Sequence, residues 1–168
     1  MNAETRIHMG SMLSAAQRYR IALVSASWHG DIVECAREAA ARELQSSGVA
    51  SDRIDSFTVP GVYEIPLFAK RLTRCRRYDA IVAFGFVVNG GIYHHEYVSS
   101  AVIDGLMRVQ IEGEVPIFSC VLTPWNFHEH ADHIEFFKKH MGKKGVEVTH
   151  ALLAALAAHH DLTSVVGG

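Results

Sequence analysis

The chain has 168 residues, of which 49% are apolar, and a formal net charge of −2 at pH 7. This length and composition are typical of one globular domain, and the weak negative charge excludes the basic surface that binding of nucleic acid requires. The three cysteines lie far apart, and no apolar run reaches the ~18 residues of a membrane span. We therefore expect a cytoplasmic protein without disulfides or membrane contact.

The first half of the chain predicts two strands, each followed by a helix. Residues 21–27 (IALVSAS) form an apolar run typical of a buried strand, and a helix is predicted over 31–47. Asp31 is the predicted N-cap of this helix, because a glutamate stands three residues later. The second strand is predicted at 54–59 and the second helix at 63–75.

The second half repeats this alternation. Strands are predicted at 80–88 and 115–123, and helices at 93–112, 126–140 and 145–160. The run GKKG at 142–145 is predicted to separate the last two helices, because glycine disfavours a helix.

Strands that alternate with helices predict an α/β fold: three layers, with a flavodoxin-like parallel sheet of four strands and helices on both faces. We expect one domain over residues 20–160, preceded by a flexible segment (1–19) and followed by a short tail (161–168). In such sheets the ligand site lies beyond the carboxyl ends of the strands. The residues that follow each strand are therefore the candidate site residues.

The residues after the first two strands suit a planar ligand that carries hydroxyl groups. Trp28 offers a flat ring for stacking, and a packing role is an equal alternative. Gly61 can adopt backbone angles that other residues avoid. Glu64 stands at a predicted helix N-terminus, where a carboxylate either favours the helix dipole or binds hydroxyl groups.

The segment after the third strand, NGGIYHHEY at 89–97, can bind an anion and can transfer protons. Two glycines before a helix N-terminus expose backbone N–H groups that can bind an anion. His94 and His95 can exchange protons near neutral pH. Adjacent helical positions diverge by about 100°, so only one of the two histidines can face the centre of a pocket.

Four sequence blocks together resemble the lumazine synthase family. They are VPGVYEIP (59–66), GFVVNGGIYHHEYV (85–98), VPIFSCVLT (115–123) and GKKGVE (142–147), and they occur in the family's order. The resemblance covers residues 20–158 and is strongest with the second type of the family, which occurs in some rhizobia.

The resemblance implies an enzyme of riboflavin biosynthesis that uses no metal and no organic cofactor. Members of the family condense 5-amino-6-(D-ribitylamino)uracil with 3,4-dihydroxy-2-butanone 4-phosphate to 6,7-dimethyl-8-ribityllumazine. The amine forms a Schiff base with the ketone, phosphate leaves, the ring closes and water is lost, so that proximity supplies much of the catalysis. The family also implies a homo-oligomer, a ring of five subunits paired into a decamer, with active sites between subunits.

Position by position, the resemblance assigns the ring and the ribityl chain to the ends of the first three strands. Trp28 would stack on the pyrimidine ring. The ribityl chain would be bound by Val62, Tyr63 and Glu64. The pyrimidine edge would meet the backbone of Phe86, Val87 and Val88.

The resemblance places phosphate binding and proton transfer in the segments that follow. The backbone amides of Gly91 and Ile92 would hold the phosphate. His94 would be the proton-transfer histidine, with His95 as a second catalytic candidate. Lys144 matches a lysine that contacts the substrates.

The sequence departs from the family at three substrate contacts. Gly91 and Ile92 stand where other members have a small residue and a threonine, so the phosphate loop lacks a hydroxyl donor. Ser119 stands where most members have an aromatic residue, and no arginine follows Arg108, so the arginine that binds phosphate in other members is missing. The candidate replacements are His130, His133, Lys138 and Lys139. The loss motivates an alternative function, a flavin- or lumazine-binding protein with weak catalysis, because binding of a ring does not require a phosphate contact.

The run HEHADH at 128–133 also spells H-x-H-x-D-H, similar to the metal-binding turn of the metallo-β-lactamase superfamily. That turn needs further ligands from distant downstream segments, and only 35 residues follow His133. We therefore predict no metal site, and instead a solvated histidine face or a contact with phosphate.

Overall fold

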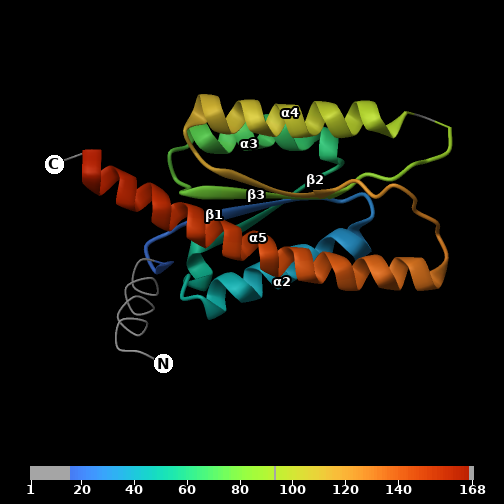
Figure 1. The fold of residues 1–168 in the computed structure, drawn as a ribbon, viewed down its shortest axis with the longest axis horizontal. Coiled ribbons are helices and arrows are strands. Elements are labelled where there is room, and N and C mark those ends of the chain that lie inside the picture. The colour runs from blue at the N-terminus through green and yellow to red at the C-terminus, as the bar shows by residue number, and fades with distance from the viewer. Residues whose placement is uncertain (1–15, 93, 167–168) are drawn as a thin grey trace.

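The computed structural model describes residues 16–92 and 94–166, and it forms a three-layer α/β domain (Figure 1). Four parallel strands pair in the order β2-β1-β3-β4. Their bounds are Ile21–Ala26 for β1, Ile54–Val59 for β2, Ala80–Phe86 for β3 and Ile117–Leu122 for β4. The predicted fold class is confirmed. Residues 1–15 of the predicted flexible segment lie outside the described residues.

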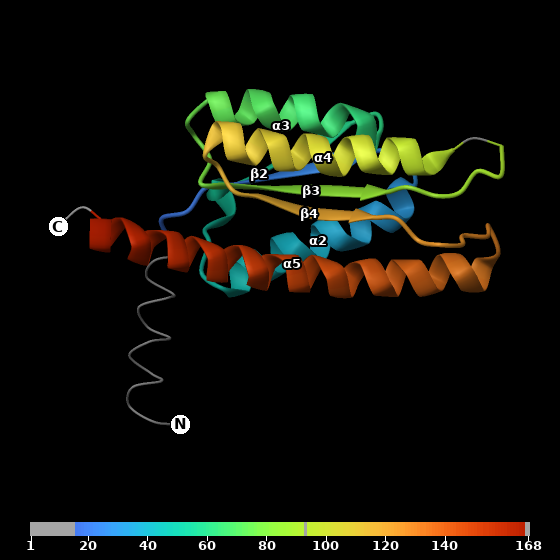
Figure 2. The same cartoon turned by 45° about the horizontal axis from the view of Figure 1, so that its top comes forward.

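Helices cover both faces of the sheet. Helices α2 and α5 lie on one face, and α3 and α4 lie on the other (Figure 2). Their bounds are Gly30–Ser46 for α2, Ile65–Arg74 for α3, His95–Gly113 for α4 and Ala131–Val166 for α5. Two 3₁₀ turns, η1 (Ser51–Arg53) and η2 (Val62–Glu64), flank β2. In residues 16–92 and 94–166, no helix is long and apolar enough to cross a membrane.

The sheet separates two apolar cores. Every residue of β1 and β3 is buried, as central parallel strands require when helices cover both faces. Alternate side chains of these strands enter opposite cores, so that Leu23 and Phe84 pack toward α2 and α5, while Val24 and Ala83 pack toward α3 and α4. This double burial fixes the register of the strands and therefore the position of the loops at their carboxyl ends.

Helix α5 corrects the prediction that GKKG ends a helix. The helix continues through Gly142 and Gly145 and runs to Val166, past the expected end at residue 160. A Cβ atom at Gly145 would overlap the backbone carbonyl of Ala36 in α2, so the glycine permits a close crossing of two helices. Next to this crossing, the buried hydroxyl of Thr149 donates to the carbonyl of Gly145 at 3.0 Å. Packing between α2 and α5 offsets the helix propensity of glycine, a cost of about 1 kcal/mol.

All four helix starts also differ from the prediction, and α3 begins at residue 65 rather than 63 and α5 at residue 131 rather than 126. Helix α2 begins at Gly30, because His29 adopts a left-handed backbone conformation (φ 53°) that turns the chain directly after β1. Asp31 does not cap this helix, and its carboxylate instead pairs with Lys138 of α5 at 3.0 Å. Helix α4 begins at His95 rather than at residue 93, so that a longer loop separates it from β3.

Candidate active site

Backbone hydrogen bonds place Trp28 beside the end of β2. The N–H of Ser27 donates to the carbonyl of Val59 at 2.8 Å, and the N–H of Trp28 donates to the carbonyl of Pro60 at 3.2 Å. The Trp28 side chain is nevertheless 69% exposed. Most of the ring is therefore available to a ligand, which favours the stacking interpretation over a role in the core.

The turn after β2 has a different cause from the one predicted. Gly61 has φ −134° and ψ 176°, an extended conformation that any residue adopts. Its N–H donates to Oε2 of Glu64 at 2.8 Å and closes the turn η2. The carboxylate of Glu64 thus has a structural contact in the free protein, while the residue as a whole stays exposed.

The neighbours of Glu64 differ in what they can offer a ligand. The Val62 side chain is buried and packs against β3, where a Cβ atom at Gly85 would overlap it. Only the backbone of Val62 can therefore serve a ligand, whereas the ring of Tyr63 is exposed.

The end of β3 is mostly buried. Phe86 and Val87 are buried, and Val88 is half-buried. The N–H of Val87 already donates to the carbonyl of Leu122 at 2.9 Å. A ligand at this edge would meet backbone groups of the three residues, as the resemblance implies, but not the N–H of Val87.

The loop between β3 and α4 carries the predicted phosphate site. Gly91 has a left-handed backbone (φ 72°) that only glycine adopts readily. Its N–H donates to Oδ1 of Asn89 at 2.9 Å, so the Asn89 amide occupies a donor that was predicted to bind phosphate. The Ile92 side chain is exposed. Asparagine before two glycines is a turn signal that could have indicated this contact.

The two candidate catalytic histidines flank one carboxylate. Nδ1 of His94 lies 3.3 Å from Oε1 of Glu96, and Nδ1 of His95 lies 3.2 Å from Oε2 of the same residue. The pKa of Glu96 is lowered by a hydrogen bond from its own backbone N–H and by the hydrogen bond with His94. His94 is exposed, whereas His95 is half-buried. No role for Glu96 was predicted from the sequence.

Aromatic rings gather where the β4–α5 loop meets the ends of β1 and β3. The ring of Phe127 contacts those of His29, Phe86 and Phe137, with centroids 5.3–5.7 Å apart. His133 of α5 stacks on Phe127 at 5.8 Å. These contacts join the loop to the same edge of the sheet that carries Trp28.

His130 and His133 do not lie on one face of a helix, which corrects the predicted histidine face. Helix α5 begins at Ala131, and the carbonyl of His130 accepts hydrogen bonds from the N–H groups of His133 and Ile134 at 3.0 Å each. His130 therefore lies before the helix. The N–H of His128 donates to Nδ1 of His133 at 3.0 Å. Among the described residues, no group of three or more His, Cys, Asp or Glu side chains is placed to hold a metal ion.

The candidate lysines already have acidic partners. Lys138 pairs with Asp31, and Nζ of Lys139 lies 3.3 Å from Oε1 of Glu135. Nζ of Lys144 lies 2.6 Å from Oε2 of Glu147.

Ser119 and Lys144 lie away from the carboxyl ends of the strands. Ser119 is exposed on the edge strand β4 and pairs with Ala83 in the middle of β3. Burial raises the pKa of the adjacent Cys120 to about 12, and the charge of Lys144 opposes this shift, so Lys144 lies close to the same strand. Within one chain, both residues are therefore separate from Trp28, Glu64 and the β3–α4 loop. They lie on opposite faces of the sheet, because the neighbours of Ser119 in β4 pack toward α5.

The fold and the strand-end residues define a three-layer α/β protein whose open site combines an exposed indole, a carboxylate and a glycine-rich loop. A family model described as 6,7-dimethyl-8-ribityllumazine synthase matches residues 18–160, and the chain belongs to this family.

Curated relatives from three bacteria support this assignment. A 6,7-dimethyl-8-ribityllumazine synthase of Rhodococcus erythropolis is 50% identical over 145 residues, which cover 86% of this chain and 94% of the relative. A 6,7-dimethyl-8-ribityllumazine synthase 2 of Bradyrhizobium diazoefficiens is 52% identical over 136 residues, 81% of each chain. A synthase 2 of Pseudomonas syringae pv. tomato is 48% identical over 128 residues, which cover 76% of this chain and 75% of the relative.

Proposed function

We propose that this protein condenses 5-amino-6-(D-ribitylamino)uracil with 3,4-dihydroxy-2-butanone 4-phosphate to 6,7-dimethyl-8-ribityllumazine in riboflavin biosynthesis. The family match over residues 18–160 carries this proposal. The exposed indole of Trp28 and the carboxylate of Glu64, side by side at the sheet edge, suit a planar ring that carries a hydroxylated chain.

The proposed roles of the residues follow from what each group can do. Trp28 stacks on the pyrimidine ring, and Glu64 accepts hydrogen bonds from the ribityl hydroxyls. The loop amides of Gly91 and Ile92 bind the phosphate, for which the Asn89 side chain would move away from the Gly91 N–H. His94 moves protons during formation of the Schiff base and ring closure, while Glu96 orients its ring. Holding both substrates together supplies most of the remaining rate.

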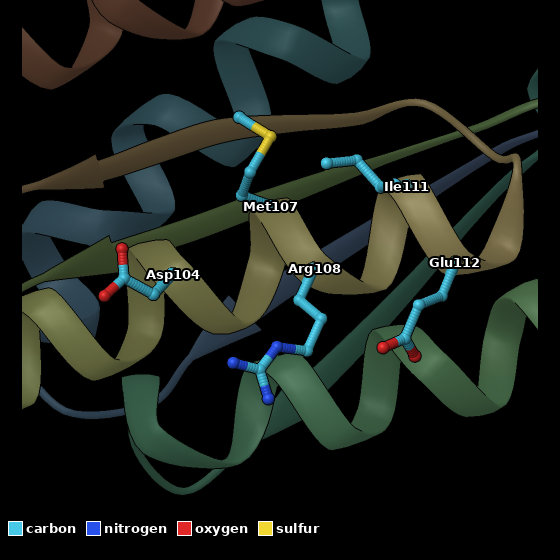
Figure 3. A pocket seen from close by; sticks show the side chains of 5 residues that line it. All are labelled: Asp104, Met107, Arg108, Ile111 and Glu112. Atoms are coloured by element: carbon cyan, nitrogen blue, oxygen red, sulfur yellow. The ribbon is translucent and has the colours of Figure 1, made fainter.

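We also propose that the active unit is a ring of five subunits, paired into a decamer. Helix α4 supports assembly, because Met107 and Ile111 are 52% and 70% exposed and project from the same side of the helix (Figure 3). With Asp104, Arg108 and Glu112 they line an open surface pocket. The separation of Ser119 and Lys144 from Trp28 supports a site completed by a neighbouring subunit.

The three cysteines are unpaired, which suits the cytoplasm as the place of action. The alternative, a lumazine- or flavin-binding protein with weak catalysis, is not favoured by the family match.

A two-substrate assay that follows the absorbance of the lumazine product tests the proposed function. We expect turnover that requires both substrates and does not change when a chelator is present. Binding of riboflavin without turnover would contradict the proposal and favour the binding protein. Loss of activity with the chelator would contradict a reaction without metal.

A further inference from the structure

Gly61 lies between two candidate site residues, and its extended backbone gives no reason for a glycine. What distinguishes the position is space. A Cβ atom here would lie 3.2 Å from Cε3 and Cζ3 of Trp28 and 3.1 Å from Oε2 of Glu64. Carbon atoms in good contact lie about 3.5–4.0 Å apart. A side chain at position 61 would therefore displace the indole, the carboxylate or both.

The backbone around Trp28 limits how the ring can respond. The hydroxyl of Ser27 donates to the carbonyl of Pro60 at 2.9 Å, and the N–H groups of Ser27 and Trp28 both donate to the segment that ends in Pro60. These contacts join the end of β1 to the turn that contains Gly61. The exposed ring would thus tilt away from position 61 while its backbone stays in place.

The same glycine also holds the carboxylate. Its N–H donates to Oε2 of Glu64 at 2.8 Å, and this charge-assisted contact fixes one oxygen of the carboxylate. The second oxygen is not used in this contact and can accept from a ligand. One residue thus leaves room for the indole because it has no side chain, and it binds the carboxylate through its N–H.

We propose that Gly61 is a positioning residue that sets the plane of the Trp28 indole relative to the Glu64 carboxylate. A heterocycle on the indole and the polyhydroxyl chain attached to it are then bound together. The proposal rests on the proposed function, which places the ring at Trp28 and the chain at Glu64. Its effect should be confined to the substrate that carries both groups, and it should not extend to the phosphorylated substrate.

Tryptophan fluorescence tests the positioning without any ligand. The sequence contains two tryptophans, Trp28 and Trp125, so Trp28 is the only reporter in a Trp125→Phe background. We expect Gly61→Ala in this background to increase quenching by acrylamide, because the ring tilts away from the backbone. Gly30→Ala is the matched control, since a Cβ atom there meets nothing within 4 Å. Equal quenching in the two variants would overturn the proposal.

A double-mutant cycle tests the consequence for binding. We expect Gly61→Ala to weaken affinity for 6,7-dimethyl-8-ribityllumazine about threefold to tenfold, the range that aromatic stacking accounts for. The Michaelis constant for 3,4-dihydroxy-2-butanone 4-phosphate should stay within about twofold, a split that general damage to the fold would not produce. In a Trp28→Ala background the effect of Gly61→Ala should largely disappear.

Two failures of this cycle are distinguishable. The positioning role of Gly61 is wrong, and the proposed ring site stands, if Trp28→Ala weakens binding but Gly61→Ala does not. The same conclusion follows if Gly61→Ala weakens binding equally with and without Trp28. If Trp28→Ala leaves affinity unchanged, the ring-binding part of the proposed function is wrong and the role of Gly61 falls with it.

Discussion

His133 accepts a hydrogen bond from the N–H of His128 through Nδ1. An imidazole nitrogen that accepts a hydrogen bond carries no proton, so the proton of the ring lies on Nε2 in this contact. A protonated His133 would direct a second N–H at the N–H of His128. The contact therefore makes His130, which lies before helix α5, the better candidate for a charged partner of phosphate.

We expect His130→Arg to lower the Michaelis constant for 3,4-dihydroxy-2-butanone 4-phosphate by about tenfold, as a charge-assisted hydrogen bond of roughly 1.5 kcal/mol would. The gain should be largest above neutral pH, where histidine side chains lose their charge and arginine keeps it. Steady-state kinetics across this pH range measure the change. His133→Arg should instead lower the unfolding temperature, because the N–H of His128 loses its acceptor. If no arginine variant improves binding and Lys138→Ala impairs it, a lysine binds the phosphate.

We expect His94→Ala to reduce turnover more than His95→Ala. A positioned proton carrier contributes ~10²–10⁴-fold, and the loss here should be at or below the lower end, because much of the reaction proceeds once the substrates are held together. Single-turnover measurements with both substrates bound separate this loss from weaker binding. A larger loss for His95→Ala would mean that the half-buried ring, rather than the exposed one, transfers the proton.

The sequence predicted the positions of Trp28 and Glu64 relative to the sheet better than it predicted what the candidate residues contact. Trp28 and Glu64 lie in the segments that follow β1 and β2, so the rule for parallel sheets was sufficient to place them at the sheet edge. The contact of Asn89 with Gly91, and the position of Glu96 between two histidines, depend on side-chain conformations. Gly61 was predicted to adopt an unusual backbone angle. Its backbone is extended instead, and the absence of a side chain leaves room for Trp28 and Glu64.

At the scale of elements, the crossing of α2 and α5 depends on Gly145. We expect Gly145→Ala to destabilise the fold by about 1–3 kcal/mol, the usual cost of overpacking, because its Cβ atom would overlap the carbonyl of Ala36. Gly142→Ala is the matched control in the same helix. Its Cβ atom meets nothing within 4 Å, and the higher helix propensity of alanine should stabilise the protein by about 0.5–1 kcal/mol. Thermal unfolding of both variants measures the difference, and equal melting temperatures would contradict the crossing argument.

The same crossing explains where the element prediction was wrong. Local propensity treats two glycines within four residues as the end of a helix, but α5 packs along α2 and uses one of them at the closest approach. The strands were predicted well because their apolar runs are short, and those of β1 and β3 are fully buried. The starts of α2, α3 and α4 were shifted by one or two residues, and α5 begins five residues later than predicted, since helix starts depend on backbone conformations such as that of His29.

At the scale of the whole molecule, the exposed side of α4 should be buried between subunits. We expect Met107→Glu to reduce the assembly to smaller species, because a carboxylate in an apolar interface loses its hydration without gaining a partner. Gln45→Glu is the control, since it adds one negative charge to an exposed position on α2. Sedimentation velocity of the two variants measures the assembly. An unchanged oligomer for Met107→Glu would show that this side of α4 lies outside the interface.

Subunit mixing tests whether neighbours share the active site. Ser119 lies on β4 and Lys144 lies on α5 near that strand, whereas Trp28 and Glu64 lie beyond the ends of β1 and β2. If a site combines Trp28 of one subunit with Lys144 of the next, Trp28→Ala and Lys144→Ala each impair every site in a uniform ring. In a ring refolded from equal amounts of both variants, about one quarter of the sites regain both residues by chance, since each heterologous interface pairs two independent subunits. Activity should then exceed the mean of the two parent variants. A site contained in one chain would give that mean, because no mixing could restore a subunit that lacks either residue.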